Sequence, residues 1–253
     1  MLISLSKENV NNWDNIHSIL NNLEKHTIPE RSINKQKNGK KINRGVAFIT
    51  FNFGIDGVSI EIQKYALILE KLFASRSKKT VFHFISGDFH DKADTVLLPR
   101  WKRFEIEGIN GWSKWDDGKW FSGLFYSDMP DNSDISDFLA KEIWKQTLKF
   151  SGILCSYIIE NNIDLLIPVN ICSNPGNLAI NLAVIIVTEL LKIKVISSNH
   201  DFYWEGGKTD RKPGEEAGVR DHFFRNYKNR PFFKLFEAVY PWNGRCWLQV
   251  NIN

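Results

Sequence analysis

The chain has 253 residues, enough for one large domain or two small ones, and 43% of them are hydrophobic, which allows a sizeable core. The net charge of +4, with 25% charged residues, argues against a dedicated nucleic-acid-binding protein. No apolar run reaches the roughly 18 residues that a membrane span needs, and the N-terminus does not have the pattern of a signal peptide. Three cysteines without a CxxC spacing indicate a reducing compartment and no structural zinc. We therefore expect a cytoplasmic protein.

The N-terminal part, residues 1–44, contains a predicted helix and a basic linker. Apolar residues recur at helical spacing over residues 6–26, and Ser6 is a candidate N-cap. The polar side of this helix is rich in asparagine rather than basic residues, so we expect it to pack on the main domain and not on a membrane. Residues 27–44 carry lysine, arginine, asparagine and glycine, as is typical of a solvated linker.

A periodic region begins at residue 45. Residues 45–53 read GVAFITFNF, a continuous apolar run that predicts a strand buried on both faces. A tight loop at residues 54–57, a helix over residues 58–73 and a strand over residues 81–85 follow. Strand, loop, helix and strand form a βαβ unit, which implies a parallel sheet with a right-handed crossover.

Residues 86–130 interrupt this alternation with an insertion rich in tryptophan and phenylalanine. Stretches at 103–106 and 119–125 alternate in polarity and predict short strands or a hairpin, with Asp117-Gly118 as a two-residue turn. The alternation then resumes with a helix over 134–161 capped by Ser133 or Asp134, a strand over 163–168, a helix over 176–191, a strand over 194–198, an interrupted helix over 215–239 and a last strand over 245–251. Residues 45–253 are therefore expected to form one α/β domain, a Rossmann-like parallel sheet with flanking helices.

Two polar loops follow predicted strands in this domain. In the first, FGIDGVS, Gly54 and Gly57 permit a tight turn and close approach of a ligand, and Ser59 lies at a helix N-terminus that suits a phosphate. A plain tight turn explains the glycines equally well. The second loop, NICSNPGN, offers neutral amides and hydroxyls of the kind that bind sugar hydroxyls, or that cap helices and turns. The candidate ligand-binding residues there are Asn170, Asn174 and Asn177.

The third loop follows the strand in VISSNHDFYWE. His200 and Asp201 are candidate catalytic groups, and His200 can act as a hydrogen-bond donor, a base or a metal ligand. His200, Asp201 and Glu205 could serve as metal ligands together, but a loop gives no geometric support for that arrangement, so we predict no metal site. Trp204 and Glu205 are candidate substrate-binding residues, and Arg211 is a cation that can hold an anionic group. An ordinary polar loop with a surface arginine is the simpler interpretation of each residue taken singly.

Taken together, the three loops carry more weight. The carboxyl ends of parallel strands meet at one edge of a sheet, where ligands bind in open α/β folds. The sequence therefore predicts a site for a polar, hydroxylated and anionic ligand at this edge, with aromatic walls available from the insertion.

The same segments resemble a known family. FGIDGVSIEIQK is similar to the first Gly-rich loop and helix of GT-B glycosyltransferases of the family 4 type. IPVNICSNPGNLAINLAV followed by SNHDFYWE is similar to segments in a branch that includes enzymes resembling mannosylglucosylglycerate synthase. The resemblance covers about residues 45–60 and 163–205, and residues 232–253 loosely.

The resemblance implies one half of a GT-B architecture, the acceptor-side domain of an enzyme that transfers a sugar from a nucleotide-sugar to a hydroxyl with retention. It implies no metal and no cofactor besides the donor substrate. By analogy, Gly54 and Gly57 approach the donor pyrophosphate and His200 lies at the transfer centre. Asp201, Trp204 and Glu205 shape the acceptor pocket by the same analogy.

Two departures from the family pattern bear on activity. Gly206-Gly207 stands where an arginine is common in the branch, and the 253 residues do not include a donor-binding domain. We therefore expect a truncated or split enzyme that is inactive without a separate donor-domain chain. The alternatives are a non-catalytic module that binds a carbohydrate or a protein, and a different small transferase that is complete in one domain.

Overall fold

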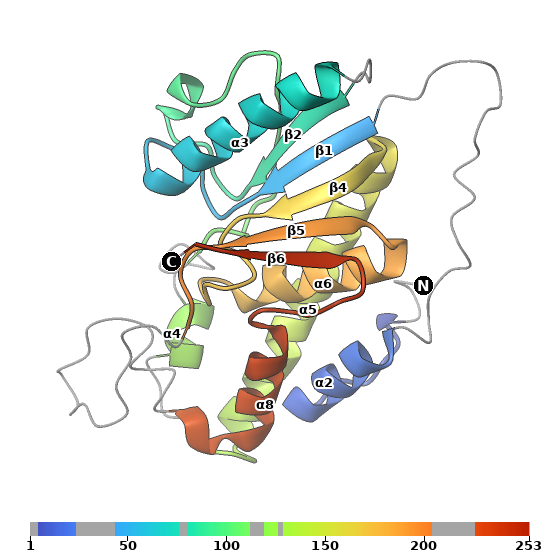
Figure 1. The fold of residues 1–253 in the computed structure, drawn as a ribbon. Helices are drawn as coiled ribbons and strands as arrows, with labels where there is room; N and C mark the ends of the chain where they lie inside the picture. Colours follow the sequence, from blue (N-terminus) through green and yellow to red (C-terminus); the bar gives the residue numbers. More distant parts are fainter. Residues whose placement is uncertain are drawn as a thin grey trace.

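The computed structural model of the chain describes residues 5–23, 44–75, 80–111, 119–125, 129–203 and 226–252. Their centre is an all-parallel six-stranded sheet with the order β3-β2-β1-β4-β5-β6, flanked by helices (Figure 1). The strands are β1 Arg44–Ile49, β2 Thr80–Ser86, β3 Lys102–Glu105, β4 Ile163–Pro168, β5 Lys194–Asn199 and β6 Trp247–Asn251. This arrangement confirms the predicted Rossmann-like α/β fold.

Helix α3, Gly57–Ala74, covers one face of the sheet over β1 and β2 (Figure 1). Alternate residues of β1 point to opposite faces. Val46 and Phe48 belong to the apolar cluster beneath α3, whereas Ala47 and Ile49 belong to the cluster on the opposite face. This burial on both faces explains the continuous apolar run that predicted the strand.

The opposite face is covered by a layer of helices. These are α5 Asp134–Glu160, α6 Leu178–Leu191 and α8 Arg230–Val239, with α2 Trp13–Asn21 outside them against α8 (Figure 1). Helix α6 is buried almost all round, as its composition of leucine, isoleucine, valine and alanine requires. Among the described residues, no helix has both the length and the apolar character to cross a membrane.

The N-terminal helix packs on the main domain, as expected, but it is shorter than predicted. Trp13 lies 5.0 Å from Phe232 between ring centroids, and its Nε1 donates to Ser136 Oγ at 3.0 Å. The N-cap is Asn12, whose side chain accepts from the Asn15 N–H, so the prediction of Ser6 as the cap is wrong. The cap lies six residues after Ser6, because the Asn12 side chain accepts a hydrogen bond from an N–H group of the first helical turn. The predicted basic linker lies almost wholly outside the described residues.

The aromatic insertion behaves differently from the prediction in one part. The predicted strand at 103–106 is β3, an edge strand parallel to β2, but Lys119–Phe125 forms helix α4, so a hairpin there is wrong. Trp120 and Leu124 are both buried and stand four residues apart, which places them on one helical face. Trp101 is buried too, so these aromatic side chains fill the core and do not line a ligand site. The predicted Asp117-Gly118 turn lies outside the described residues.

Most of the remaining predicted elements agree with the structure to within a few residues, whereas of the helix predicted over 215–239 only Arg230–Val239 is α-helical in the described part and residues 215–225 lie outside it. Ser133 caps α5, β4 has the predicted bounds, and α6 begins at Leu178 after its N-cap Asn177. The short 3₁₀ turns are η2 Ala93–Thr95 and η4 Asn226–Lys228, and α8 follows η4 after the cap Asn229.

The sheet is covered unequally. Leu248 and Val250 of β6 pair with Ile196 and Ser198 of β5 and lie on the same face as α3. Leu248 remains 59% exposed and Val250 is exposed as well, whereas α3 lies mainly over β1 and β2 (Figure 1). Within the described part of the chain, this face of β5 and β6 has no covering helix.

Candidate functional site at the carboxyl edge of the sheet

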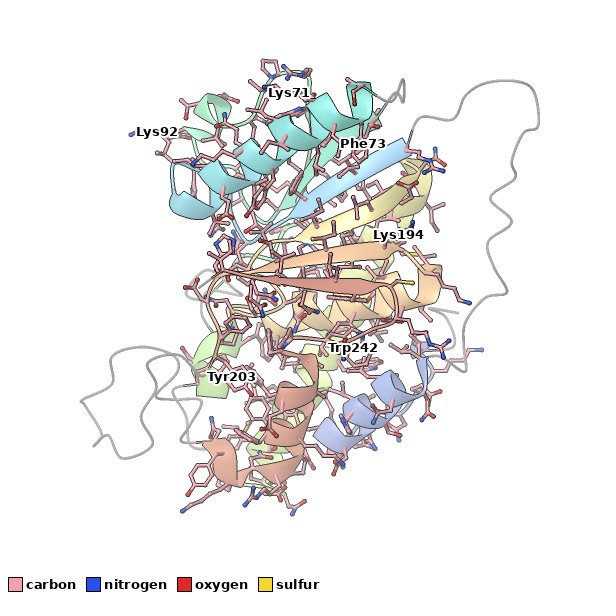
Figure 2. The ribbon with its side chains drawn as sticks, viewed as in Figure 1. Lys71, Phe73, Lys92, Lys194, Tyr203 and Trp242 are labelled. Atoms are coloured by element: carbon pink, nitrogen blue, oxygen red, sulfur yellow. The ribbon has the colours of Figure 1, made fainter. Side chains whose placement is uncertain are left out.

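The candidate site lies where the strand order reverses. The chain builds β1, β2 and β3 outward in one direction and β4, β5 and β6 outward in the other, so β1 and β4 meet at the switch point of the sheet. Loops diverge there and leave room for ligands in open α/β folds. The loops after β1, β4 and β5 all lie at this carboxyl edge, whereas Lys194 marks the opposite edge (Figure 2).

The loops after β4 and β5 are joined by one asparagine and one aspartate. Asn170 Nδ2 donates to Asp201 Oδ2 at 2.6 Å, and the Asp201 N–H donates back to Asn170 Oδ1 at 3.1 Å. Ser173 Oγ also donates to Asn170 Oδ1. Asn170 has a φ of 64°, a conformation that asparagine tolerates better than most residues. The structure thus brings Asn170 and Asp201 together, as the sequence predicted for residues of one edge.

His200 contacts residues of β5 and of α3. Its Nε2 lies 3.3 Å from Ser198 Oγ and 3.3 Å from Glu61 Oε2. The side chains of His200 and Glu61 are 15% and 25% exposed, so both remain accessible in part. Tyr65, one helical turn after Glu61, donates its hydroxyl to Glu61 Oε1. This bond to the carboxylate, followed by burial, raises the pKa of Tyr65.

The first loop is closed by its own side chains. Asp56 is the N-cap of α3: its carboxylate accepts from the Ser59 N–H at 2.8 Å and from Ser59 Oγ at 2.9 Å. The Gly54 N–H donates to Ser59 Oγ at 3.2 Å, so it points into the loop. A carboxylate at a helix N-terminus repels a phosphate that approaches the same N–H groups. Phosphate binding by Gly54, Gly57 and Ser59 therefore stays a prediction without geometric support.

The two glycines of this loop differ in what they make room for. A Cβ at Gly54 would lie 3.0 Å from the His90 ring, whereas a Cβ at Gly57 would meet nothing within 4 Å. Neither residue has a positive φ. Gly54 thus packs closely against the His90 side chain, and Gly57 is an ordinary first residue of α3.

Asn174 and Asn177 are buried, as Asn170 is. Asn177 has no exposed surface: its Oδ1 caps α6 through Ile180 N, and its Nδ2 donates to the carbonyls of Gly108 and Asn110. Both of its N–H donors are used within the protein, so the amide joins the β3 loop to α6.

Three predicted site residues, Trp204, Glu205 and Arg211, lie outside the described residues. Within the described ranges, no group of three or more histidine, cysteine, aspartate or glutamate side chains could hold a metal ion. Cys172 is fully buried, and burial raises the pKa of its thiol well above the ordinary value, which removes it as a nucleophile.

Sequence reasoning missed three residues of this site. Glu61 and Tyr65 stand four apart on α3 and so share one face, and Ser198 lies on the same face of the sheet as α3. The spacing of Glu61 and Tyr65 was visible in the sequence. Their meeting with His200 was not visible, because it depends on α3 reaching over the switch point toward β5.

The site therefore combines a histidine, two carboxylates, an asparagine amide and two hydroxyls, which come from α3, from β5 and from the loops after β4 and β5. Such groups bind hydroxyl-rich ligands through directional hydrogen bonds and can move a proton. Comparisons of the chain with protein-family models, curated proteins and solved structures gave no match.

Proposed function

We propose that this chain is the acceptor-side domain of a nucleotide-sugar-dependent glycosyltransferase that works with retention. The observation that supports it best is the convergence of His200, Asp201 and Asn170 at the switch point of a parallel sheet. That position suits a polar ligand. The sequence resemblance of the same loops to family 4-like enzymes supplies the reaction class.

In this proposal the acceptor hydroxyl lies against the carboxyl edge. Asp201, held by Asn170, and His200 accept or donate hydrogen bonds to acceptor and sugar hydroxyls and so fix their orientation. Trp204, Glu205 and Arg211 complete the acceptor pocket. The nucleotide is held mainly by a second Rossmann-like domain that faces this one across a cleft. Rate enhancement then rests on positioning and on stabilising the departing diphosphate.

The closed loop after β1 bears on which of the two domains holds the diphosphate. The carboxylate of Asp56 occupies the N-terminus of α3, so the acceptor-side domain contributes little to holding a diphosphate. We therefore expect weak binding of a nucleotide-sugar by this chain alone and place the phosphate-binding cations on the donor domain.

A second function class is supported by a separate observation. Leu248 and Val250 present an exposed apolar surface on β6, close to the carboxyl edge. A non-catalytic module that binds a protein or a carbohydrate would use such a surface directly. It requires no acid, base or donor domain, and it predicts that substitution of His200 leaves binding unchanged.

The first test is an activity assay on the purified chain with UDP-glucose or GDP-mannose as donor and small polyols as acceptors. Released nucleoside diphosphate and glycosylated product are both measured, with and without a co-purified donor-domain chain. We expect transfer only in the presence of that second chain, and a loss of at least tenfold in the assembly carrying His200→Ala. Efficient transfer by the isolated chain would refute the proposal that it forms only the acceptor side of the active site. Full activity of the assembly with His200→Ala would refute the role of His200.

A further inference from the structure

Four side chains gather between α3 and the end of β5. Tyr65 Oη donates to Glu61 Oε1, and Ser198 Oγ contacts His200 Nε2 at 3.3 Å. Glu61 Oε2 lies 3.3 Å from the same nitrogen and so connects the two pairs.

The Glu61 carboxylate presents one oxygen to each of two neighbours. An ionised glutamate only accepts hydrogen bonds, so the Tyr65 hydroxyl must donate to Oε1. The other oxygen, Oε2, faces His200 Nε2.

The same carboxylate acts on His200 through space. An unprotonated Nε2 would direct its lone pair toward an anionic oxygen 3.3 Å away, whereas an Nε2–H is attracted to that oxygen and to Ser198 Oγ. The two acceptors therefore favour the tautomer with the proton on Nε2. Among the described residues, Nδ1 of His200 has no hydrogen-bond partner.

We propose that Glu61 is a positioning residue that, by its direct contact with Nε2, holds His200 as the Nε2–H tautomer and presents Nδ1 as the acceptor for a ligand hydroxyl. Glu61 itself does not touch the ligand. The part that concerns the ligand rests on the proposed function, whereas the tautomer does not.

The charged and titratable groups around the imidazole agree with this assignment. Glu61 and Tyr65 face it from α3, and Asp201 follows it in the chain with its carboxylate bound to Asn170. In the described part of the chain, no lysine or arginine pairs with Glu61. The histidine is therefore the one basic group that the Glu61 carboxylate meets there.

The test is NMR spectroscopy of the full chain with ¹⁵N-labelled histidine, at a pH where the imidazole is neutral. We expect a pyrrole-type ¹⁵N shift for Nε2 of His200, a pyridine-type shift for Nδ1 and a protected Hε2 signal. Glu61→Leu should remove the Hε2 protection and raise the fraction of the Nδ1–H tautomer. The isosteric Glu61→Gln should do the same to a smaller extent, and it covers the case in which Glu61→Leu does not fold.

Two matched variants separate the carboxylate from general packing. Tyr65→Phe should keep the Nε2–H tautomer, because Glu61 still faces His200, while the protected Tyr65 hydroxyl signal disappears. Glu70→Leu, on the same helix but paired with Arg100, should leave the spectrum of His200 unchanged. A wild-type His200 protonated on Nδ1, or a His200 spectrum that Glu61→Leu and Glu61→Gln leave unchanged, would overturn the proposal.

A binding measurement then tests the ligand part separately. Glucose is titrated into wild type, His200→Ala, Glu61→Leu and the double variant. We expect each single variant to raise Kd several-fold and the double variant to add little, because both remove the same interaction. Additive losses would overturn the coupling. Absence of glucose binding in all four proteins, with the predicted tautomer intact, would count against the proposed function and not against the role of Glu61.

Discussion

Two asparagines of the loop after β4, Asn170 and Asn177, have the same side chain but different structural roles. Asn177 is fully buried, and its amide caps α6 and donates to two carbonyls of the β3 loop. Asn170 lies at the edge of the sheet with a positive φ and binds the Asp201 carboxylate. The Asn177 amide satisfies backbone groups of the protein, whereas the Asn170 amide orients the half-buried carboxylate of Asp201. The identity of the hydrogen-bond partner, not residue type or burial, separates structural amides from candidate site residues, since both asparagines are buried.

Two histidines show the same contrast. His83 on β2 has no exposed surface and contacts Tyr157 Oη through Nδ1 at 2.9 Å. Burial, with a smaller effect from Lys102, lowers the pKa of His83 to about 4. His200 is partly exposed and faces a carboxylate. We therefore assign His83 to the core and His200 to the site.

The largest expected effect comes from the structural asparagine. Asn177→Ala removes a helix cap, worth about 1 kcal/mol, and leaves two carbonyls without their donor, at about 1 kcal/mol or more each. We expect the free energy of unfolding to fall by about 3 kcal/mol in urea denaturation. The matched control at the edge is Asp201→Asn, whose side chain can still accept from Asn170 and should change stability by less than about 1 kcal/mol. Equal losses of unfolding free energy in both variants would contradict the different roles of the two asparagines.

The next effect is a pH dependence that belongs to His83. The unfolded chain binds a proton near pH 6.5 and the folded chain only near pH 4, so stability rises with pH between these values and is lost as the pH falls through this window. Between pH 7.5 and pH 5 this amounts to about 2 kcal/mol. Urea denaturation of wild type and His83→Phe at both pH values measures it. The variant should lose about 2 kcal/mol less than wild type on acidification, and identical losses in the two proteins would contradict the assignment of His83 to the core.

The sequence was sufficient for most of the architecture. Continuous apolar runs identified β1 and β4, and side-chain caps such as Ser133 marked helix starts. The sequence was insufficient at Lys119–Phe125. The polarity pattern of this seven-residue segment fits both a strand and a helix, and the tertiary packing of Trp120 and Leu124 favours the helix. Ser6 failed as a cap because Asn12, nearer the apolar stripe, binds the first-turn N–H.

For the candidate site, parallel topology was enough to predict that Asn170 and Asp201 meet. The loop after β1 was predicted from its glycines, but its conformation is set by Asp56. The Asp56 side chain bonds both the N–H and the hydroxyl of Ser59 and so closes the turn. Glu61 was not found, since its contact with His200 joins elements about 140 residues apart and depends on the tilt of α3. Long-range contacts of this kind leave no local pattern in a sequence.

The central claim is that the carboxyl edge binds a hydroxylated ligand, and mapping of backbone amide shifts tests it most directly. The ¹⁵N-labelled chain is titrated with glucose and, separately, with UDP-glucose or GDP-mannose. We predict saturable shifts at Asn170, His200, Asp201 and Glu61, and none at the opposite edge around Arg44, Thr80 and Lys194. Shifts confined to Leu248 and Val250, or no saturable shift with any of these ligands, would contradict the claim.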